Sequence, residues 1–129
     1  MLAVDTNVVV RYLTRDDPQE AARSKQVVDG NEVFVATTVL LETEWVLRSS
    51  YRFTRSQIVE ALRGFAALPS ITLEDAAVAA KALDWTARGM DFADALHLAS
   101  AGQCEAFVTF DRRFAAAANT LAGLSVRAP

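Results

Sequence analysis

The stretch Met1-Leu2-Ala3-Val4-Asp5-Thr6-Asn7 decides the fold that we expect for this chain. A short apolar run, residues 2–4, ends at a carboxylate and is followed by two small polar residues. This pattern is typical of a buried strand that stops at a polar edge. Ligands of open parallel sheets bind outside the carboxyl ends of the strands, so we interpret Asp5 as the first ligand of a metal site. The alternative is that Asp5 only caps the following helix.

The chain has 129 residues, the size of one domain, and we expect residues 1–129 to form a single domain. Hydrophobic residues make up 52% of it, yet no apolar run approaches the roughly 18 residues that a membrane span needs. The first residues lack a signal-peptide pattern, and the only cysteine is Cys104. We therefore expect a cytoplasmic protein with no membrane contact, in which Cys104 is a packed thiol and not a nucleophile paired with His97.

Apolar segments and helix signals alternate along the chain. Strand patterns occupy residues 2–4, 33–35, 71–73, 106–110 and 124–126. Between them, Asp17-Pro18 and the pair Thr54 and Gln57 are typical of helix starts. This alternation predicts an α/β fold with a mostly parallel sheet of about five strands and helices on both faces.

The net charge is −3, which at first sight argues against a nucleic-acid partner. Apart from Lys25 and Lys81, however, every basic residue is an arginine. The planar guanidinium group binds phosphate in a bidentate manner, although codon bias explains the composition equally well. The candidates for contacting a nucleic-acid backbone, or for being plain surface charges, are Arg11, Arg15, Arg48, Arg52, Arg55, Arg112 and Arg113.

Two acids follow predicted strands. Asp5 comes after the first strand and Asp111 after the fourth, and right-handed crossovers that place these strands side by side would bring both carboxylates to one edge of the sheet. Asp111 also stands where it can cap the next helix, and the two roles are compatible. Thr6, Asn7 and Thr109 are short polar neighbours that either orient the acids or serve as turn and cap residues.

A further acid, Glu42, lies in a predicted helix over residues 38–50. Val39 and Val46 are three and four positions away, so we expect its carboxylate to be buried and to need a partner. Glu44 is different because Arg48 follows four residues later, and a surface ion pair accounts for it. We therefore favour Glu42 over Glu44 as the site residue.

Asp91 and Asp94 open another predicted helix and lie on one face of its first turn. Capping and the helix dipole alone would favour both acids. Beside Asp5 and Asp111, however, they would repel one another unless a cation neutralised them. We interpret Asp94 as a direct ligand and Asp91 as an auxiliary acid that caps the helix. An oxygen-only set of ligands suits Mg²⁺ or Mn²⁺, which would support hydrolysis of a phosphodiester bond.

These motifs together resemble a known family. The segments Val4-Asp5-Thr6-Asn7, Leu41–Leu47, Asp91–Leu96 and Thr109-Phe110-Asp111 are similar to those of PIN-domain ribonucleases, and within these to the VapC-like toxins of bacterial toxin–antitoxin pairs. The resemblance covers the whole chain in order. It places the acidic quartet of the family on Asp5, Glu42, Asp94 and Asp111, with Asp91 as a further acid.

The resemblance implies a three-layer α/β/α sandwich with a small parallel sheet. It implies Mg²⁺- or Mn²⁺-dependent cleavage of RNA, inhibition of translation, dimerisation of the toxin, and silencing by a cognate antitoxin protein that blocks the acidic pocket. The RNA target is not implied, because family members differ in it.

Two alternatives come from other classes. A phosphatase of the haloacid-dehalogenase kind also has an aspartate after its first strand, but it needs a second aspartate where this chain has Asn7. A non-catalytic module that binds only RNA or a partner protein would be expected to lack one of the acids, and none is missing here.

Overall fold

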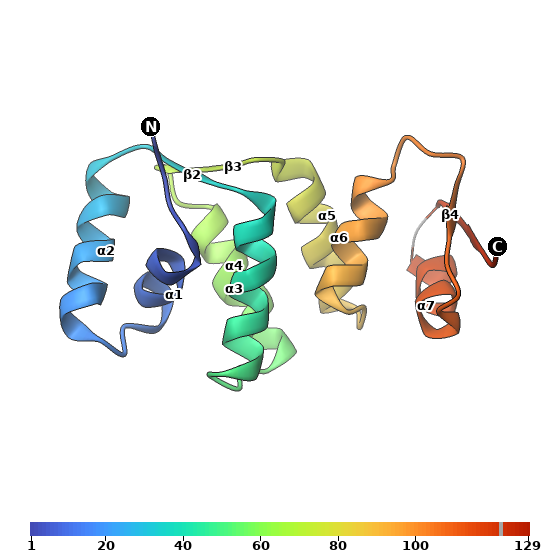
Figure 1. Cartoon of the computed structure of the whole chain (residues 1–129), viewed down its shortest axis with the longest axis horizontal. Coiled ribbons are helices and arrows are strands. Elements are labelled where there is room, and N and C mark those ends of the chain that lie inside the picture. Colours follow the sequence, from blue (N-terminus) through green and yellow to red (C-terminus); the bar gives the residue numbers. More distant parts are fainter. Residues whose placement is uncertain (122) are drawn as a thin grey trace. The chain divides into compact units, whose positions relative to one another are not determined.

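The computed structural model describes residues 1–121 and 123–129 and shows an α/β protein (Figure 1). The chain divides into two compact units, Met1–Ala76 and Ala77–Pro129, and each is described by itself. Within the described residues no helix is long and apolar enough to cross a membrane.

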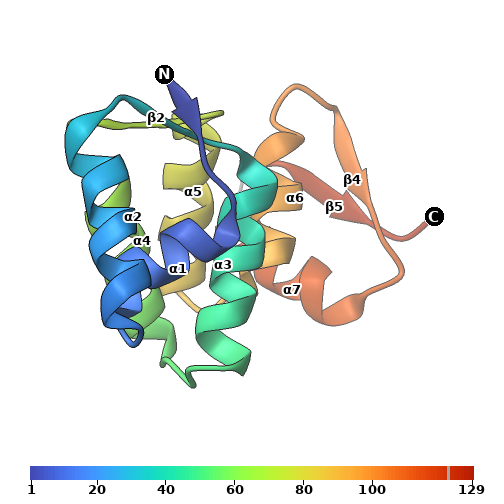
Figure 2. The ribbon, with the colours of Figure 1, turned by 60° about the vertical axis from the view of Figure 1, so that its left-hand side comes forward.

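The first unit combines a three-stranded sheet with four helices. Its elements are β1 (Leu2–Ala3), α1 (Thr6–Thr14), α2 (Pro18–Gly30), β2 (Val33–Val35), α3 (Thr37–Ser49), α4 (Arg55–Ala66) and β3 (Ile71–Leu73). All strands are parallel, in the order β1-β2-β3, and Val33 in the central strand is level with Leu2 on one side and Ile71 on the other. Helix α1 packs against both α2 and α3, and α3 packs against α4 (Figure 2).

Local signals explain where two of these helices begin. Asp17 accepts a hydrogen bond from the backbone N–H of Glu20, at 3.1 Å, and Pro18 occupies the first turn of α2. Thr54 and Gln57 form a reciprocal capping box at the start of α4. These signals confirm the predicted helix starts.

The core of the first unit consists of aliphatic and aromatic side chains from the helices and from β2. Ile58, Leu62 and Phe65 lie on one face of α4 and are at most 2% exposed. Phe65 also packs edge-to-face against Tyr12 of α1, with ring centroids 5.7 Å apart. This face of α4 therefore belongs to the core.

The second unit contains α5 (Ala76–Ala87), α6 (Phe92–Ser100), β4 (Ala106–Val108), α7 (Arg112–Leu121) and β5 (Ser125–Arg127). Strands β4 and β5 are parallel and α7 connects them, with Phe107 level with Val126. The rings of Phe107 and Phe114 stack at 4.8 Å, which holds α7 against β4.

The α/β class and the parallel direction of the strands are confirmed, and each of the five predicted strands is present. The predicted burial of the first strand is wrong, because both residues of β1 are exposed. In the described residues they pair as three strands and two strands, each set within its own unit. The proximity of the first and fourth strands, the three-layer sandwich and the single domain stay predictions.

Candidate functional site

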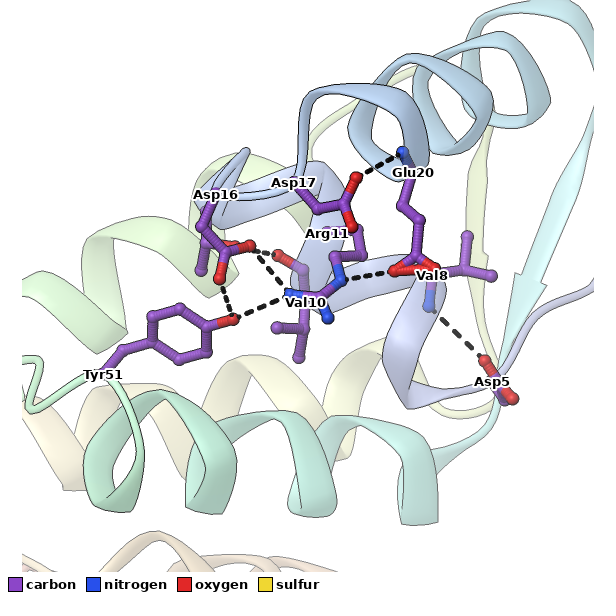
Figure 3. Close-up of polar contacts among 9 residues, drawn as sticks. Asp5, Val8, Val10, Arg11, Asp16, Asp17, Glu20 and Tyr51 are labelled. Carbon is purple, nitrogen blue, oxygen red and sulfur yellow. Dashed lines mark hydrogen bonds and ion pairs between the residues drawn. The ribbon is translucent and has the colours of Figure 1, made fainter.

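Asp5 lies between β1 and α1 and is solvent-exposed. It is the N-cap of α1, and its Oδ1 faces the backbone N–H of Val8 at 3.4 Å (Figure 3). Asp5 therefore caps α1, and its role as a metal ligand stays a prediction. Capping uses one oxygen atom, so the carboxylate keeps further lone pairs with which to bind a cation.

Glu42 extends from α3 toward the start of α1. The hydroxyl of Thr6, a residue that is 6% exposed, donates a hydrogen bond to Oε1 of Glu42. This hydrogen bond holds the carboxylate of Glu42 beside Thr6, the residue that follows Asp5. It therefore connects the helix that carries one candidate acid to the neighbour of another.

The predicted burial of Glu42 is wrong, because Glu42 is exposed and Glu44 is 5% exposed. Glu44 shares its helix face with the buried Leu40 and Leu47. Arg48 reaches back over one turn and donates to the Glu44 carboxylate at 2.9 Å, so the predicted pair exists but one partner is buried. The flanking valines of Glu42 are only half-buried, which is why they do not enclose it.

In the second unit, Asp91 and Asp94 occupy the start of α6 as predicted. Asp91 is the N-cap and accepts a hydrogen bond from the backbone N–H of Asp94 at 3.1 Å. Burial raises the pKa of the Asp94 carboxyl above its usual value, and the negative charges of Asp91 and Asp111 raise it further, while His97 partly offsets them. His97 itself is exposed.

Asp111 caps α7. Its Oδ1 accepts hydrogen bonds from the backbone N–H groups of Arg113 and Phe114 at 2.9 and 3.0 Å. The hydroxyl of Thr109 accepts a hydrogen bond from the backbone N–H of Asp111 at 3.0 Å, so Thr109 fixes the turn that presents this acid.

Burial and the negative charges of Asp91 and Asp111 raise the pKa of Asp94, so these two carboxylates lie near that of Asp94. Such a set, which offers only oxygen atoms, suits a hard cation such as Mg²⁺ or Mn²⁺ in its chemistry. In the described residues, no three His, Cys, Asp or Glu side chains are grouped so as to hold an ion. That Asp5, Glu42, Asp94 and Asp111 bind one cation therefore stays a prediction.

An arginine-centred network in the first unit joins α1 to α2, to the loop between these helices and to Tyr51 (Figure 3). Arg11 donates to Glu20 and to Asp16, each at 2.8 Å, and the hydroxyl of Tyr51 donates to Asp16 at 2.6 Å. The hydrogen bond from Tyr51, with help from Thr14 and Arg11, lowers the pKa of Asp16 to about 2. Because its charge is balanced in this way, Arg11 is a weaker candidate for contacting RNA.

Two exposed aromatic residues beside the acids were missed by the sequence reasoning. Trp45 is 56% exposed and lies one helical turn after Glu42, and Phe110 is 88% exposed and directly precedes Asp111. Their position in the sequence next to carboxylates was the available signal. The prediction of a packed thiol is also wrong, because Cys104 is exposed in the turn region before β4.

Comparison with known proteins gives one family and a distant structural neighbour. Residues 2–119 match the family described as PIN domain. No curated protein matches. Among solved structures, the chain is similar to VapC20 of Mycobacterium tuberculosis, described as a toxin that cleaves the sarcin-ricin loop. The identity is 21%, with 91% of this chain and 95% of that chain covered, at a TM-score of 0.43.

Proposed function

Since the chain belongs to the PIN domain family, we propose that it is an endoribonuclease that depends on a divalent cation, Mg²⁺ or Mn²⁺. The match over residues 2–119 carries this proposal, because the matched range includes all of the candidate acids. It also argues against the phosphatase alternative, which belongs to a different fold family.

In this proposal Asp5, Glu42, Asp94 and Asp111 hold the cation, and Asp91 assists. A bound Mg²⁺ or Mn²⁺ would provide a water molecule of lowered pKa and would balance the charge on the phosphate in an in-line displacement.

Other side chains of the protein hold the candidate acids in position in the proposed mechanism. Thr6 fixes the carboxylate of Glu42 through its hydrogen bond. Asp91 caps α6 and thereby places Asp94 in the first turn, and Thr109 does the same for the turn that carries Asp111. Holding the acids in place before substrate arrives lowers the cost of reaching the reactive geometry.

The charge pattern supports an RNA substrate. Arg112 and Arg113 are exposed and follow Asp111 directly, and the exposed Phe110 precedes it. Arginines that contact phosphates and aromatic rings that stack on unpaired bases are the usual means of binding single-stranded RNA.

The test is cleavage of end-labelled total RNA, which contains transfer and ribosomal RNA, by purified protein with Mn²⁺, with Mg²⁺ and with EDTA. We expect discrete fragments that disappear with the chelator and with Asp5→Asn or Asp94→Asn. Asp29→Asn is the matched control, because Asp29 is an exposed aspartate of α2 paired with Lys25 and should leave cleavage unchanged. Cleavage that persists with EDTA, or equally in Asp5→Asn, would contradict the proposal.

We further propose that the protein is the toxin of a toxin–antitoxin pair, that it inhibits translation, forms a homodimer and is silenced by a cognate antitoxin protein. The resemblance to VapC-like toxins and the family match support this role. Induced expression should stop incorporation of labelled methionine within minutes in cells that lack the antitoxin, and Asp5→Asn should not. Equal inhibition by both proteins would show that the effect does not come from the proposed site.

A further inference from the structure

A pocket of about 240 Å³ lies between α1 and α2, and none of the candidate metal-binding acids lines it. Its lining residues are Asn7, Val8, Arg11, Glu20, Arg23, Ser24 and Val27. All of them belong to the first unit, and the contact between α1 and α2 holds the two walls together.

Ser24 places a hydroxyl group at the wall of this pocket. The residue is 6% exposed and its hydroxyl forms no hydrogen bond to another described residue, but no buried side-chain oxygen of the described residues lacks a partner, so this hydroxyl is open to solvent at the pocket. The Ser24 hydroxyl, at the pocket wall, is therefore available to a ligand.

The lining suits a flat ring with polar edges. Val8 and Val27 supply apolar surface, and the amide of Asn7 and the hydroxyl of Ser24 supply donors and acceptors. The volume is below the roughly 300–1,000 Å³ of sites for drug-sized ligands. A volume of about 240 Å³ is large enough for one heterocyclic base.

Of the charged side chains that line the pocket, two form an ion pair with each other, and the third forms none with another described residue. Arg11 and Glu20 form an ion pair at 2.8 Å that fixes one wall (Figure 3). Arg23 is exposed and forms no ion pair with another described residue, so its guanidinium group can contact a phosphate.

The pocket also lies next to the candidate site. Asn7 lines it and is the second residue of α1, whose N-cap is Asp5. A strand of RNA with a phosphate near Asp5 could therefore place a neighbouring base against Asn7.

We propose that this pocket binds one base of the RNA substrate, close to the cleaved phosphate, and sets the base preference of cleavage. The inference rests on the proposed ribonuclease function. Ser24 and Asn7 contact the edge of the base, Val8 and Val27 contact its face, and Arg23 contacts a flanking phosphate. Unpaired RNA bases are commonly recognised through such edge and face contacts.

Cleavage of an RNA pool with random bases around the cut tests the proposal, with fragments read by sequencing. We expect a preference at one position that falls about fivefold in Ser24→Val, which removes the hydroxyl and its hydrogen bond to the base. Ser56→Val, an exposed serine of α4 outside the pocket, should keep the preference. Arg23→Ala, an exposed change that cannot disturb the core, should weaken RNA binding, and Arg23→Lys should partly restore it.

A second measurement does not depend on cleavage. The amide signals of a ¹⁵N-labelled sample are followed while each nucleoside 5′-monophosphate is added in the presence of EDTA. We expect at least one nucleotide to shift the signals of Ser24 and Val27 in the wild type and not in Ser24→Val.

The two readouts separate the pocket from the nuclease. Absence of cleavage with intact nucleotide shifts would count against the proposed function alone. Cleavage with an unchanged base preference in both Ser24→Val and Arg23→Ala, or no nucleotide shift in the wild type, would overturn the pocket assignment. It would also be overturned if Ser24→Val weakened inhibition by a partner protein and left the base preference unchanged.

Discussion

Replacing Thr6 by Val tests the contact that joins α1 to the candidate acid on α3. Valine has nearly the same shape, so the packing of this 6%-exposed residue is kept while the hydrogen bond to Glu42 is lost. Hydrogen bonds to charged groups contribute about 1.5–3 kcal/mol when buried. Because Glu42 is exposed and water can replace the hydroxyl, we expect a loss of about 1 kcal/mol in the free energy of unfolding, which is roughly a 3–5 °C fall in Tm for a chain of this length.

A double-mutant cycle isolates this contribution. Urea unfolding of the wild type, Thr6→Val, Glu42→Gln and the double variant gives the coupling energy between the two side chains. The structure predicts a coupling of about 1 kcal/mol, and additivity within about 0.3 kcal/mol would refute the contact. If Thr6 also orients Glu42 for catalysis, Thr6→Val should lower kcat for RNA cleavage at saturating metal and leave KM nearly unchanged.

Three further predictions follow from the described contacts. Leu62→Ala should cost about 2–5 kcal/mol in unfolding free energy, because the side chain is 1% exposed in the core, and equilibrium unfolding in urea measures this. The low pKa of Asp16 stabilises the fold above pH 4 and loses this effect as pH falls toward 2, so Tyr51→Phe should move acid unfolding to higher pH in a circular-dichroism titration. The raised pKa of Asp94 has the opposite sign: ionisation at neutral pH destabilises the fold, so Asp94→Asn should have a higher Tm than the wild type at pH 7 and an equal Tm near pH 3.

The predictions from sequence succeeded where the signal is local. Helix starts such as Asp17-Pro18 and the capping box at Thr54 are determined by residues three apart, and the structure has both. Strands such as residues 33–35 were recognisable because both of their faces are apolar. Each of these features can be recognised from the sequence of its own segment, without knowing which other segments it contacts.

The predictions failed where burial depends on tertiary packing. Glu42 and Glu44 both lie in an apolar helix, and only the packing of α3 decides that the face with Leu40 and Leu47 is buried. The network of Arg11 and Tyr51 joins residues 40 positions apart, and no periodic pattern encodes such a contact. The same holds for the pocket between α1 and α2.

At the candidate site, three acids had two possible roles from sequence, capping a helix and binding a metal. Asp5, Asp91 and Asp111 each had a structural explanation from sequence, namely capping a helix, and each of them does cap a helix. Capping and metal binding are compatible for one carboxylate, so the sequence alone could not separate them. A cap also explains how the chain fixes an acid at a helix N-terminus before any cation binds.

The most direct test of the central claim, that acids from both ends of the chain bind one cation, is paramagnetic broadening by Mn²⁺. Sub-stoichiometric Mn²⁺ is added to ¹⁵N-labelled protein, and the amide signals next to Asp5 and next to Asp94 are followed. We predict that both sets broaden together at the same Mn²⁺ concentration, and that Asp5→Asn removes the broadening of both. Broadening confined to one set, or broadening next to Asp94 that is unchanged in Asp5→Asn, would contradict a shared metal site.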